Sequence, residues 1–305
     1  MSGGVDSSAA VKLLLEQGYE CAGATMHLYN NEDIGLERSK TCCSLNDVED
    51  ARFVAFKLGI DFHVFNLSDR FKEMVIDNFV NTYLEGGTPN PCIECNKHLK
   101  FGSFLDRARL LDFDYIATGH YVQREYCEES GRWLLKRSPD RSKDQSYVLY
   151  GMTQDQLAHT LFPCGGMRKE DIRAKAEANG LINAKKPDSQ DICFVPDGDY
   201  AKVIENRTGK TPEPGPFLDL NGNVIGTHRG IIHYTVGQRR GLRMPSDGKI
   251  YVVRILPEQN AVVVGPNEAL FTRECFVPGM HWISGEAPAL PFRCSAKTRY
   301  RQPEQ

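Results

Sequence analysis

The sequence has 305 residues, of which 41% are hydrophobic and 25% charged, and its formal net charge is −3. These proportions are typical of a folded globular protein and argue against a disordered, collagen-like or coiled-coil chain. No run reaches the roughly 18 apolar residues of a membrane span, and the first residues lack a secretory signal pattern, so a cytoplasmic protein is expected, with an organellar matrix as the alternative.

Helices and strands are predicted to alternate through the first 120 residues. A helix at 7–18 has apolar residues at helical spacing and ends at Gly18, and a strand at 20–28 follows. The next helix begins near Ser44, where Asp47 three residues later resembles a capping box, and it ends at Gly59. The other elements expected here are a strand at 60–67, helices at 68–84 and 96–111, and a strand at 115–118. This alternation predicts an α/β fold with a doubly wound, mostly parallel sheet.

After residue 120 the pattern changes to a hairpin that ends near 136, followed by helices at 153–161 and 169–179. From about 211 the chain has short strands separated by Gly and Pro, with 217–220 and 224–225 joined through Asn221-Gly222, and later strands at 251–256 and 261–264. We therefore predict three domains: an α/β domain at 1–140, a small linking domain at 141–210 and a β-barrel-like domain at 211–305.

The segment Ser2-Gly3-Gly4-Val5-Asp6-Ser7-Ser8 stands directly before the first predicted helix. Paired glycines let the backbone approach a ligand, the hydroxyl groups can donate hydrogen bonds, and the helix N-terminus adds N–H groups and a positive dipole. The segment lacks the Gly-Lys-Ser/Thr of the ordinary P-loop. It therefore predicts a phosphate-binding loop of a different kind, although a single Gly-Gly is more often only a capped turn.

This loop resembles the pyrophosphatase loop of enzymes that use ATP to adenylylate a carbonyl oxygen, among them synthetases for GMP, NAD and argininosuccinate. Further segments, in chain order, resemble the tRNA-specific 2-thiouridylase family: TPNPCIECNKHLKF at 88–101, DYIATGHY at 114–121, KDQSYVLY at 143–150, AKKPDSQDICF at 184–194, HYTVGQRRGL at 233–242 and KTRYRQ at 297–302. That family replaces O2 of the wobble uridine, position 34 of certain tRNAs, with sulfur.

The resemblance implies roles for individual residues. ATP and Mg²⁺ would be held at the loop and at two further backbone positions, and the full set is Ser2, Gly3, Gly4, Val5, Asp6, Ser7, Met26 and Gly119. Cys95 would be the catalytic nucleophile, and Cys193 would receive a persulfide from a sulfur-donor protein. The same resemblance implies a disulfide bond. Because Lys97, His98 and Lys100 follow Cys95 at an expected helix start, we predict a lowered thiol pKa there.

The target base would contact Asn90, Pro91 and Cys92, where the sequence departs from the family pattern. Many members have Asn-Pro-Asp, and this chain has Asn-Pro-Cys. Three thiolates, from Cys92, Cys95 and Cys193, could instead hold a [4Fe-4S] cluster with one open iron. A zinc site is less expected, because no second CxxC is present. Cys42 and Cys43 could be a second redox pair, but a structural role is the more probable interpretation on residues alone.

The partner implied by the resemblance is the anticodon stem-loop of tRNA. His120, Lys143, Asp144, Gln145, Arg299 and Tyr300 would contact it. A wobble base must leave its stack to expose C2, and a basic run could guide the backbone, with Trp133 and Tyr147 available for stacking. The run consists of Arg132, Lys136, Arg137, Arg141 and Lys143, and Arg239, Arg240, Arg299 and Arg301 extend it.

Met1 stands immediately before Ser2, so the strand that should deliver the chain to the loop is expected to be missing, and the C-terminal domain is expected to be incomplete. Two other functions stay open. One is another adenylylating ligase, such as one that uses ammonia, which would not need the cysteine pair. The other is a non-catalytic RNA-binding protein that retains the loop.

Overall fold

A computed structural model describes residues 1–30, 45–187, 192–195, 197–243, 248–300 and 302–305. The predictions made for Cys42, Cys43, Ser44 and Arg301 concern positions outside the described residues. The elements of the first half are α1 Val5–Glu16, β1 Gly23–His27, α2 Leu45–Leu58, β2 Phe62–Asn66, α3 Ser68–Phe71, η2 Lys72–Ile76, α4 Asp77–Leu84, α5 Pro91–Glu94, η3 Cys95–Ser103, α6 Phe104–Leu110, β3 Ile116–Ala117, β4 Val122–Cys127 and β5 Arg132–Arg137.

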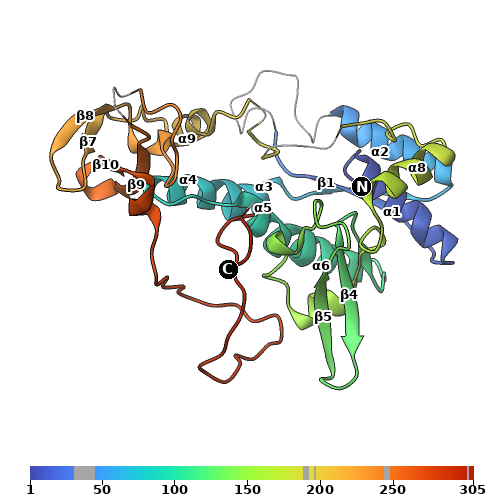
Figure 1. Ribbon diagram of the computed structural model, residues 1–305. Helices are drawn as coiled ribbons and strands as arrows, with labels where there is room; N and C mark the ends of the chain where they lie inside the picture. The colour runs from blue at the N-terminus through green and yellow to red at the C-terminus, as the bar shows by residue number, and fades with distance from the viewer. Residues whose placement is uncertain (31–44, 188–191, 196, 244–247, 301) are drawn as a thin grey trace.

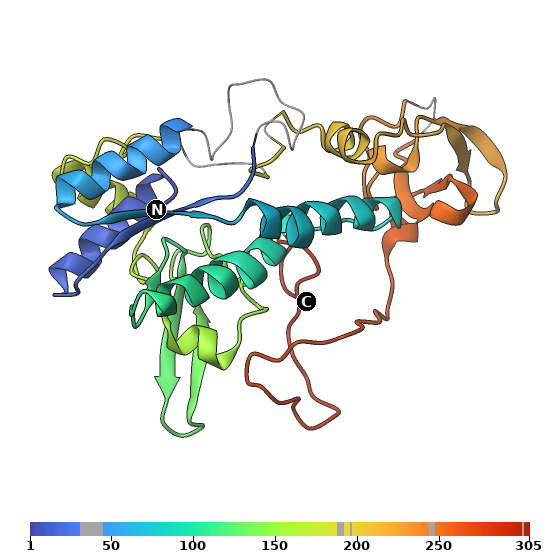
Figure 2. The ribbon, with the colours of Figure 1, turned by 180° about the vertical axis from the view of Figure 1, so that it is seen from behind.

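The second half contains η4 Ser146–Val148, α7 Gln154–Ala158, β6 Thr160–Leu161, α8 Lys169–Ala178, α9 Tyr200–Thr208, β7 Gly215–Leu218, β8 Val224–His228, η5 Ile231–His233, β9 Tyr251–Leu256, η6 Pro257–Gln259, β10 Ala261–Gly265 and η7 Asn267–Leu270. Figures 1 and 2 show β7–β10 at one end of the molecule and α1, α2 and α8 at the other, with α3–α4 running between them. No helix of the described residues is long and apolar enough to cross a membrane.

The N-terminal part is α/β with parallel strand pairing, as predicted. Strand β1 pairs with β2 and strand β3 with β6, both parallel. In the described residues these pairs form two separate sheets rather than one continuous sheet. Met1 lies beside β1, because its amine donates to the Ala24 carbonyl and the Thr25 hydroxyl donates to the Met1 carbonyl at 2.6 Å. The chain therefore enters the glycine loop from the edge of β1.

Several predicted element bounds differ from the structure, and two of these differences have a clear physical reason. The helix expected at 96–111 already begins at Pro91, since the Asn90 side chain caps it by accepting from the Cys92 N–H at 3.2 Å. The helix expected at 153–161 stops at Ala158, and Thr160 and Leu161 form β6 instead. Pairing with β3 decides the state of this short apolar run, which its own sequence leaves ambiguous.

The C-terminal part forms a four-stranded mixed sheet in the order β8-β7-β10-β9, so the predicted β-rich domain is confirmed. Asp219 accepts from the N–H groups of Asn221 and Asn223, both at 2.8 Å, and Gly222 takes φ +88° between β7 and β8. The predicted Asn-Gly turn is therefore formed. The chain after η7 leaves this sheet and returns to the middle of the molecule (Figure 1).

Hydrophobic clusters join segments that are far apart in sequence. One cluster combines Phe71 and Phe79 of the α3–α4 helix with Phe194 and with Ile204 of α9. A second joins α6, β3, β4 and α7 across residue 140. A shared cluster does not by itself define a domain boundary, so the boundaries at 140 and 210 stay predictions.

Candidate active site

The glycine loop is shaped by hydrogen bonds to its own serines. Gly3 has φ +69°, which favours glycine, and Gly4 is the N-cap of α1 without a capping side chain. The hydroxyl groups of Ser7 and Ser8 donate to the Gly4 carbonyl at 3.1 and 3.2 Å, and Ser2 N–H donates to the Ser7 hydroxyl at 3.1 Å. The chain is thus folded over the N-terminus of α1, where N–H groups and the helix dipole favour an anion.

Segments from elsewhere in the chain hold this loop in place. The Asn183 amide donates to the carbonyl groups of Gly3 and Gly4, each at 3.2 Å. A Cβ on Gly3 would lie 2.6 Å from the Asp47 carbonyl oxygen, so the loop packs directly on the start of α2. Asp47 in turn accepts from Lys186 at 2.6 Å. Sequence reasoning missed Asn183 and Lys186, although Lys186 stands in the AKKPDSQDICF segment that carries the family resemblance and Asn183 directly precedes it.

Asp6 is the most densely contacted residue of the loop. The Lys169 ammonium lies 2.7 Å from both of its carboxylate oxygens, and the Tyr121 hydroxyl donates to Oδ1 at 2.7 Å. A Cβ on Gly119 would lie 2.7 Å from the Asp6 carbonyl carbon, so the backbone after β3 touches the loop. The Cys164 thiol donates to the Asp6 carbonyl at 3.5 Å, and burial raises the pKa of this thiol to about 12. The structure therefore brings the loop and Gly119 together, as expected.

The two candidate cysteines belong to the same hydrophobic cluster. Cys95 is buried in it, and Cys193 packs against it half-buried. Tyr29, just after β1, donates its hydroxyl to the Cys193 carbonyl at 2.7 Å, and Met26 of β1 packs against the same cluster. The thiols of Cys95 and Cys193 and strand β1, which lies next to the phosphate loop, therefore contact the same hydrophobic cluster.

The predicted lowering of the Cys95 pKa was wrong. Burial raises the pKa of this thiol, the Lys100 ammonium lowers it, and Cys92 raises it. Cys95 lies in the second turn of the helix because Pro91 is its first residue, so the N-terminal dipole acts on the exposed Cys92 rather than on Cys95. From Cys95 onward the helix continues as the π-helical segment η3, a rare geometry that is frequent at functional sites.

The described residues differ in how well they suit an iron–sulfur cluster and a magnesium ion. There, no three or more His, Cys, Asp and Glu side chains converge as they would around a metal ion. Among these residues, Cys92, Cys95 and Cys193 are therefore not arranged to hold a [4Fe-4S] cluster. Mg²⁺ needs fewer protein ligands, because it commonly uses one or two carboxylates together with substrate phosphates. Asp6 satisfies that demand.

The residues predicted to contact tRNA belong to two parts of the sequence, 120–145 and 299–300. His120 is buried, its Nδ1 lies 2.9 Å from the Thr118 hydroxyl, and burial holds its pKa well below the ordinary value, so the ring is neutral. Asp144 accepts from Ser138 N–H at 2.9 Å, and the Gln145 side chain accepts from Tyr121 N–H at 2.9 Å. Tyr121 therefore connects the loop at 143–145 to the phosphate loop, because its N–H donates to Gln145 and its hydroxyl donates to Asp6.

The C-terminal segment closes over the loop at 143–145. The Tyr300 hydroxyl donates to the Asp144 carbonyl at 3.1 Å, and the Tyr147 hydroxyl donates to the Thr298 carbonyl at 3.2 Å. Arg299 reaches the other way and donates to the Val236 carbonyl at 2.8 Å. The structure therefore brings the two predicted tRNA-contacting segments together, although their separation in sequence is about 150 residues.

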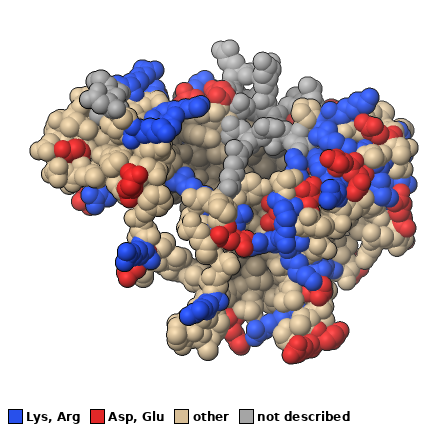
Figure 3. All heavy atoms as spheres, viewed as in Figure 1, with Lys and Arg blue, Asp and Glu red and all other residues tan. Residues whose placement is uncertain are grey.

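Most of the predicted basic run is paired with acidic residues. Arg132 pairs with Glu286 at 2.9 Å, Lys136 with Glu125 at 2.6 Å, and Arg137 with Glu304. On the face seen in Figure 3, basic side chains are interleaved with acidic ones. The expectation that Trp133 is free for stacking was wrong, because its ring packs against a hydrophobic cluster and lies under the Arg124 guanidinium at 4.3 Å.

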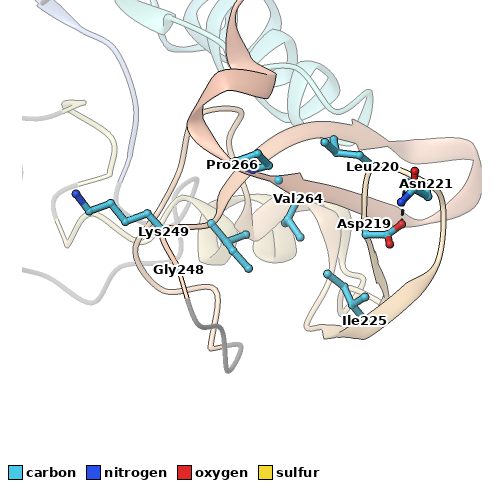
Figure 4. Close-up of a pocket in the computed structure, with 10 residues that line it drawn as sticks. Asp219, Leu220, Asn221, Ile225, Gly248, Lys249, Val264 and Pro266 are labelled. Carbon is cyan, nitrogen blue, oxygen red and sulfur yellow. Dashed lines mark hydrogen bonds between the residues drawn. The ribbon is translucent and has the colours of Figure 1, made fainter.

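A separate hollow of about 400 Å³ lies in the C-terminal sheet. Figure 4 shows Leu220, Ile225 and Val264 around it, with the Asp219–Asn221 hydrogen bond at its rim. Its lining is mostly apolar and contains none of the predicted site residues. This hollow therefore has no part in the candidate active site.

Comparison with known proteins agrees with these features. Residues 1–197 match the family profile described as "tRNA methyl transferase HUP domain", and residues 201–266 match "tRNA methyl transferase PRC-barrel domain". The "tRNA-specific 2-thiouridylase MnmA" of Clostridioides difficile (strain 630) is 49% identical over 300 residues, which cover 98% of this chain and 83% of that protein.

A protein of the same name from Acetivibrio thermocellus is 50% identical over 308 residues, covering 100% of this chain and 85% of the relative. "tRNA-specific 2-thiouridylase MnmA 1" of Thermoanaerobacter sp. (strain X514) is 50% identical over 306 residues, covering 100% and 84%. With matches of this extent over both parts of the fold, the chain belongs to the tRNA-specific 2-thiouridylase family.

Proposed function

We propose that this chain converts the wobble uridine, position 34 of tRNA, to 2-thiouridine in an ATP-dependent reaction. The observation that carries the proposal is the arrangement of two chemical regions around β1. A phosphate-binding loop lies at its edge, and an apolar cluster containing Cys95 and Cys193 contacts its Met26. Uridine O2 is a poor leaving group, so a reaction at C2 needs both activation by a nucleotide and a sulfur nucleophile.

The activation step belongs to the glycine loop. Uridine O2 would attack the α-phosphate of ATP, forming an O2-adenylate and releasing pyrophosphate. The N–H groups at the start of α1 and the Ser2 and Ser7 hydroxyls would hold that pyrophosphate, and Mg²⁺, when bound by Asp6, would offset the charge that develops on it. Met26 and Gly119 would position the adenosine. Gly119 suits this role because it follows the carboxyl end of β3, where ligands of α/β sheets bind.

The sulfur step belongs to the thiols. The terminal sulfur of a Cys193 persulfide would attack C2 and expel AMP, which leaves uridine joined to Cys193 through two sulfur atoms. The Cys95 thiolate would then attack the Cys193 sulfur, releasing 2-thiouridine and leaving a Cys95–Cys193 disulfide that an external thiol reduces. We favour this route over a [4Fe-4S] cluster because the described thiols do not converge as cluster ligands.

The tRNA would lie across the segments at 143–147 and 298–300. The ion pairs of Arg132 and Lys136 are exposed, and surface pairs contribute only about 0–1 kcal/mol. Phosphate groups of an RNA can therefore replace their carboxylate partners at little cost. Lys143, Arg299 and Tyr300 would supply backbone and stacking contacts, and His120, being neutral, would act as a hydrogen-bonding rather than a charged group.

The proposal is tested by mass spectrometry of nucleosides from tRNA incubated with the chain, ATP, Mg²⁺ and a persulfide-carrying donor protein. We expect 2-thiouridine with the wild-type chain and none with Cys95→Ser or Cys193→Ser. Cys21→Ser is the matched control, because Cys21 is a half-buried free thiol outside the family motifs, and it should retain activity.

Pyrophosphate release separates the two half-reactions. It should depend on tRNA and should persist for one turnover in Cys95→Ser, since adenylylation precedes the step that uses Cys95. A wild-type chain that releases pyrophosphate and incorporates ammonia rather than sulfur would be the other kind of adenylylating ligase. A chain that binds tRNA without releasing pyrophosphate would be a non-catalytic RNA-binding protein.

A further inference from the structure

The ion pair between Lys169 and Asp6 lies inside the phosphate-binding loop. Lys169 is only 7% exposed, which is unusual for a lysine, and its ammonium is 2.7 Å from both oxygens of Asp6. It is the first residue of α8, and its N–H donates to the Asp140 carboxylate at 3.3 Å. The Tyr121 ring lies 5.6 Å from the ammonium. The buried ammonium of Lys169 is therefore held in contact with Asp6 of the loop.

The charges of the loop explain why Lys169 lies beside Asp6. The N-terminus of α1 attracts a phosphate group, whereas the Asp6 carboxylate in its first turn repels one. Lys169 neutralises that carboxylate. When a Mg²⁺-bound nucleotide engages Asp6, the ammonium loses this carboxylate in a buried position, where the loss of a counter-charge is strongly disfavoured. The polyphosphate of the same nucleotide is the nearest replacement.

We propose that Lys169 changes partners during the reaction, moving from Asp6 to the β- and γ-phosphates of ATP, and that it holds the departing pyrophosphate. The proposal rests on the proposed function, because it assigns Lys169 to the activation step of that reaction. The chain has no lysine inside its glycine loop. Lys169 supplies from α8 the cation that the ordinary P-loop carries in its own sequence.

Lys186 is a second ammonium near the loop, and its contacts suit a fixed role. It pairs with two carboxylates, Asp47 at 2.6 Å and Asp50 at 2.7 Å, so the trio keeps a net negative charge. Neither carboxylate belongs to the loop. Lys169, in contrast, pairs with the one carboxylate that a metal-bound nucleotide would claim. The exchange is therefore assigned to Lys169 and not to Lys186.

The first experiment compares inorganic pyrophosphate with AMP by isothermal titration calorimetry in the presence of Mg²⁺. In Lys169→Gln we expect the pyrophosphate Kd to rise about ten-fold or more, as for the loss of one charge-assisted hydrogen bond, with the AMP Kd changing less than about three-fold. Lys175→Gln is the matched control, since Lys175 lies on the same helix and pairs with α1 through Glu16 at 3.4 Å. It should leave both values unchanged. Equal weakening of both ligands, or of neither, overturns the proposal.

The second experiment omits Mg²⁺ and uses Asp6→Asn. This variant removes the repelling carboxylate and releases Lys169, so pyrophosphate should bind several-fold more tightly than to the wild-type chain. The double variant Asp6→Asn/Lys169→Gln should lose most of that gain. If Lys169 only fixes α8 to the loop, the single and double variants bind alike, and the proposal is overturned. Circular dichroism melts of every variant identify any loss of folding.

These outcomes are independent of the nucleoside assay. A chain whose pyrophosphate binding follows the pattern above, but which forms no 2-thiouridine, would contradict the proposed function and leave the phosphate role of Lys169 in place. If the wild-type chain thiolates tRNA and the Lys169→Gln variant binds pyrophosphate normally, the proposed function is supported and the phosphate role of Lys169 is contradicted.

Discussion

The substitution Gly119→Ala tests the contact between β3 and the glycine loop. A Cβ at this position would lie 2.7 Å from the Asp6 carbonyl carbon, 2.8 Å from its Cβ and 2.9 Å from its carbonyl oxygen. These atoms are backbone or directly attached to it, so no flexible side-chain end can turn away. Ordinary contact begins at 3.4 Å, so the two segments must separate by up to 3.4 − 2.7, or about 0.7 Å.

A separation of this size changes the loop itself. If Asp6 moves by this amount away from Lys169, their 2.7 Å contact lengthens toward 3.4 Å, which is beyond a good hydrogen bond. Overpacking of this kind costs about 1–3 kcal/mol. In a domain of about 150–250 residues, 1 kcal/mol lowers Tm by about 2–4 °C, so a fall of roughly 2–12 °C is expected. ATP affinity should decrease at least ten-fold, because the displaced Asp6 and Gly119 are both residues proposed to hold ATP.

Differential scanning fluorimetry with and without ATP measures both effects. The control is Gly166→Ala, where the nearest atom to the added Cβ is the Gln123 side-chain oxygen at 3.9 Å, so neither Tm nor the shift on adding ATP should change. If Gly119→Ala matches the wild-type chain in Tm and in ATP-induced stabilisation, the close approach does not constrain the loop and the reasoning is refuted.

Two further predictions concern charge. The Lys100 ammonium lowers the Cys95 pKa against the larger effect of burial, so Lys100→Met should slow alkylation of Cys95 by iodoacetamide at pH 8, followed by peptide mass spectrometry; an equal effect of Lys97→Met would contradict this. Burial holds the pKa of His120 well below its ordinary 6.5, so this residue contributes stability that is present above pH 6.5 and lost as the pH falls from there toward the folded pKa. Urea midpoints should decrease between pH 7.5 and 5, and less steeply in His120→Gln.

The elements that sequence predicted well are those whose signals are local. The apolar stripes that form α1 and α2 end at glycine, and Gly18 and Gly59 take φ +86° and +69° as helix-terminating residues should. The strand at Thr160 and Leu161 was missed because two residues carry no periodicity of their own. Its state is decided by Ile116 and Ala117, the residues of β3 that pair with it.

The residues that complete the phosphate loop could not be predicted from local patterns. Lys169 and Asn183 are separated from their loop partners by 163 and 180 residues. A lysine at a helix start and an asparagine in a loop are ordinary features, and only the folded chain places them on Asp6 and Gly3. Similarity of whole segments to a known family identified the loop and the thiols, but it named only the residues that the family motifs mark.

The pKa of Cys95 shows why counting nearby basic residues in the sequence predicted a pKa shift in the wrong direction. Three basic residues follow Cys95 within five positions, yet only Lys100 acts on it, and burial outweighs that effect. Local charge is visible in a sequence, but desolvation of Cys95 depends on its place in a cluster that includes Phe71 and Phe194, which come from other segments. Burial of the Cys95 thiol could therefore be predicted only with the tertiary fold.

The opposite surroundings of the two regions match the opposite needs of the two half-reactions. Transfer to a phosphate needs cations and N–H donors, and the loop has them in Lys169 and the start of α1. In the proposed reaction, a persulfide on Cys193 has to be protected from water and stray thiols, and the apolar cluster that Cys193 packs against would contribute to this, while burial raises the pKa of the neighbouring Cys95 thiol. In that proposal, the raised pKa of Cys95 would couple the two steps, because Cys95 would become a competent nucleophile only when its surroundings change. The event that brings charge and polar groups to this cluster in the proposed reaction is the arrival of the adenylylated base.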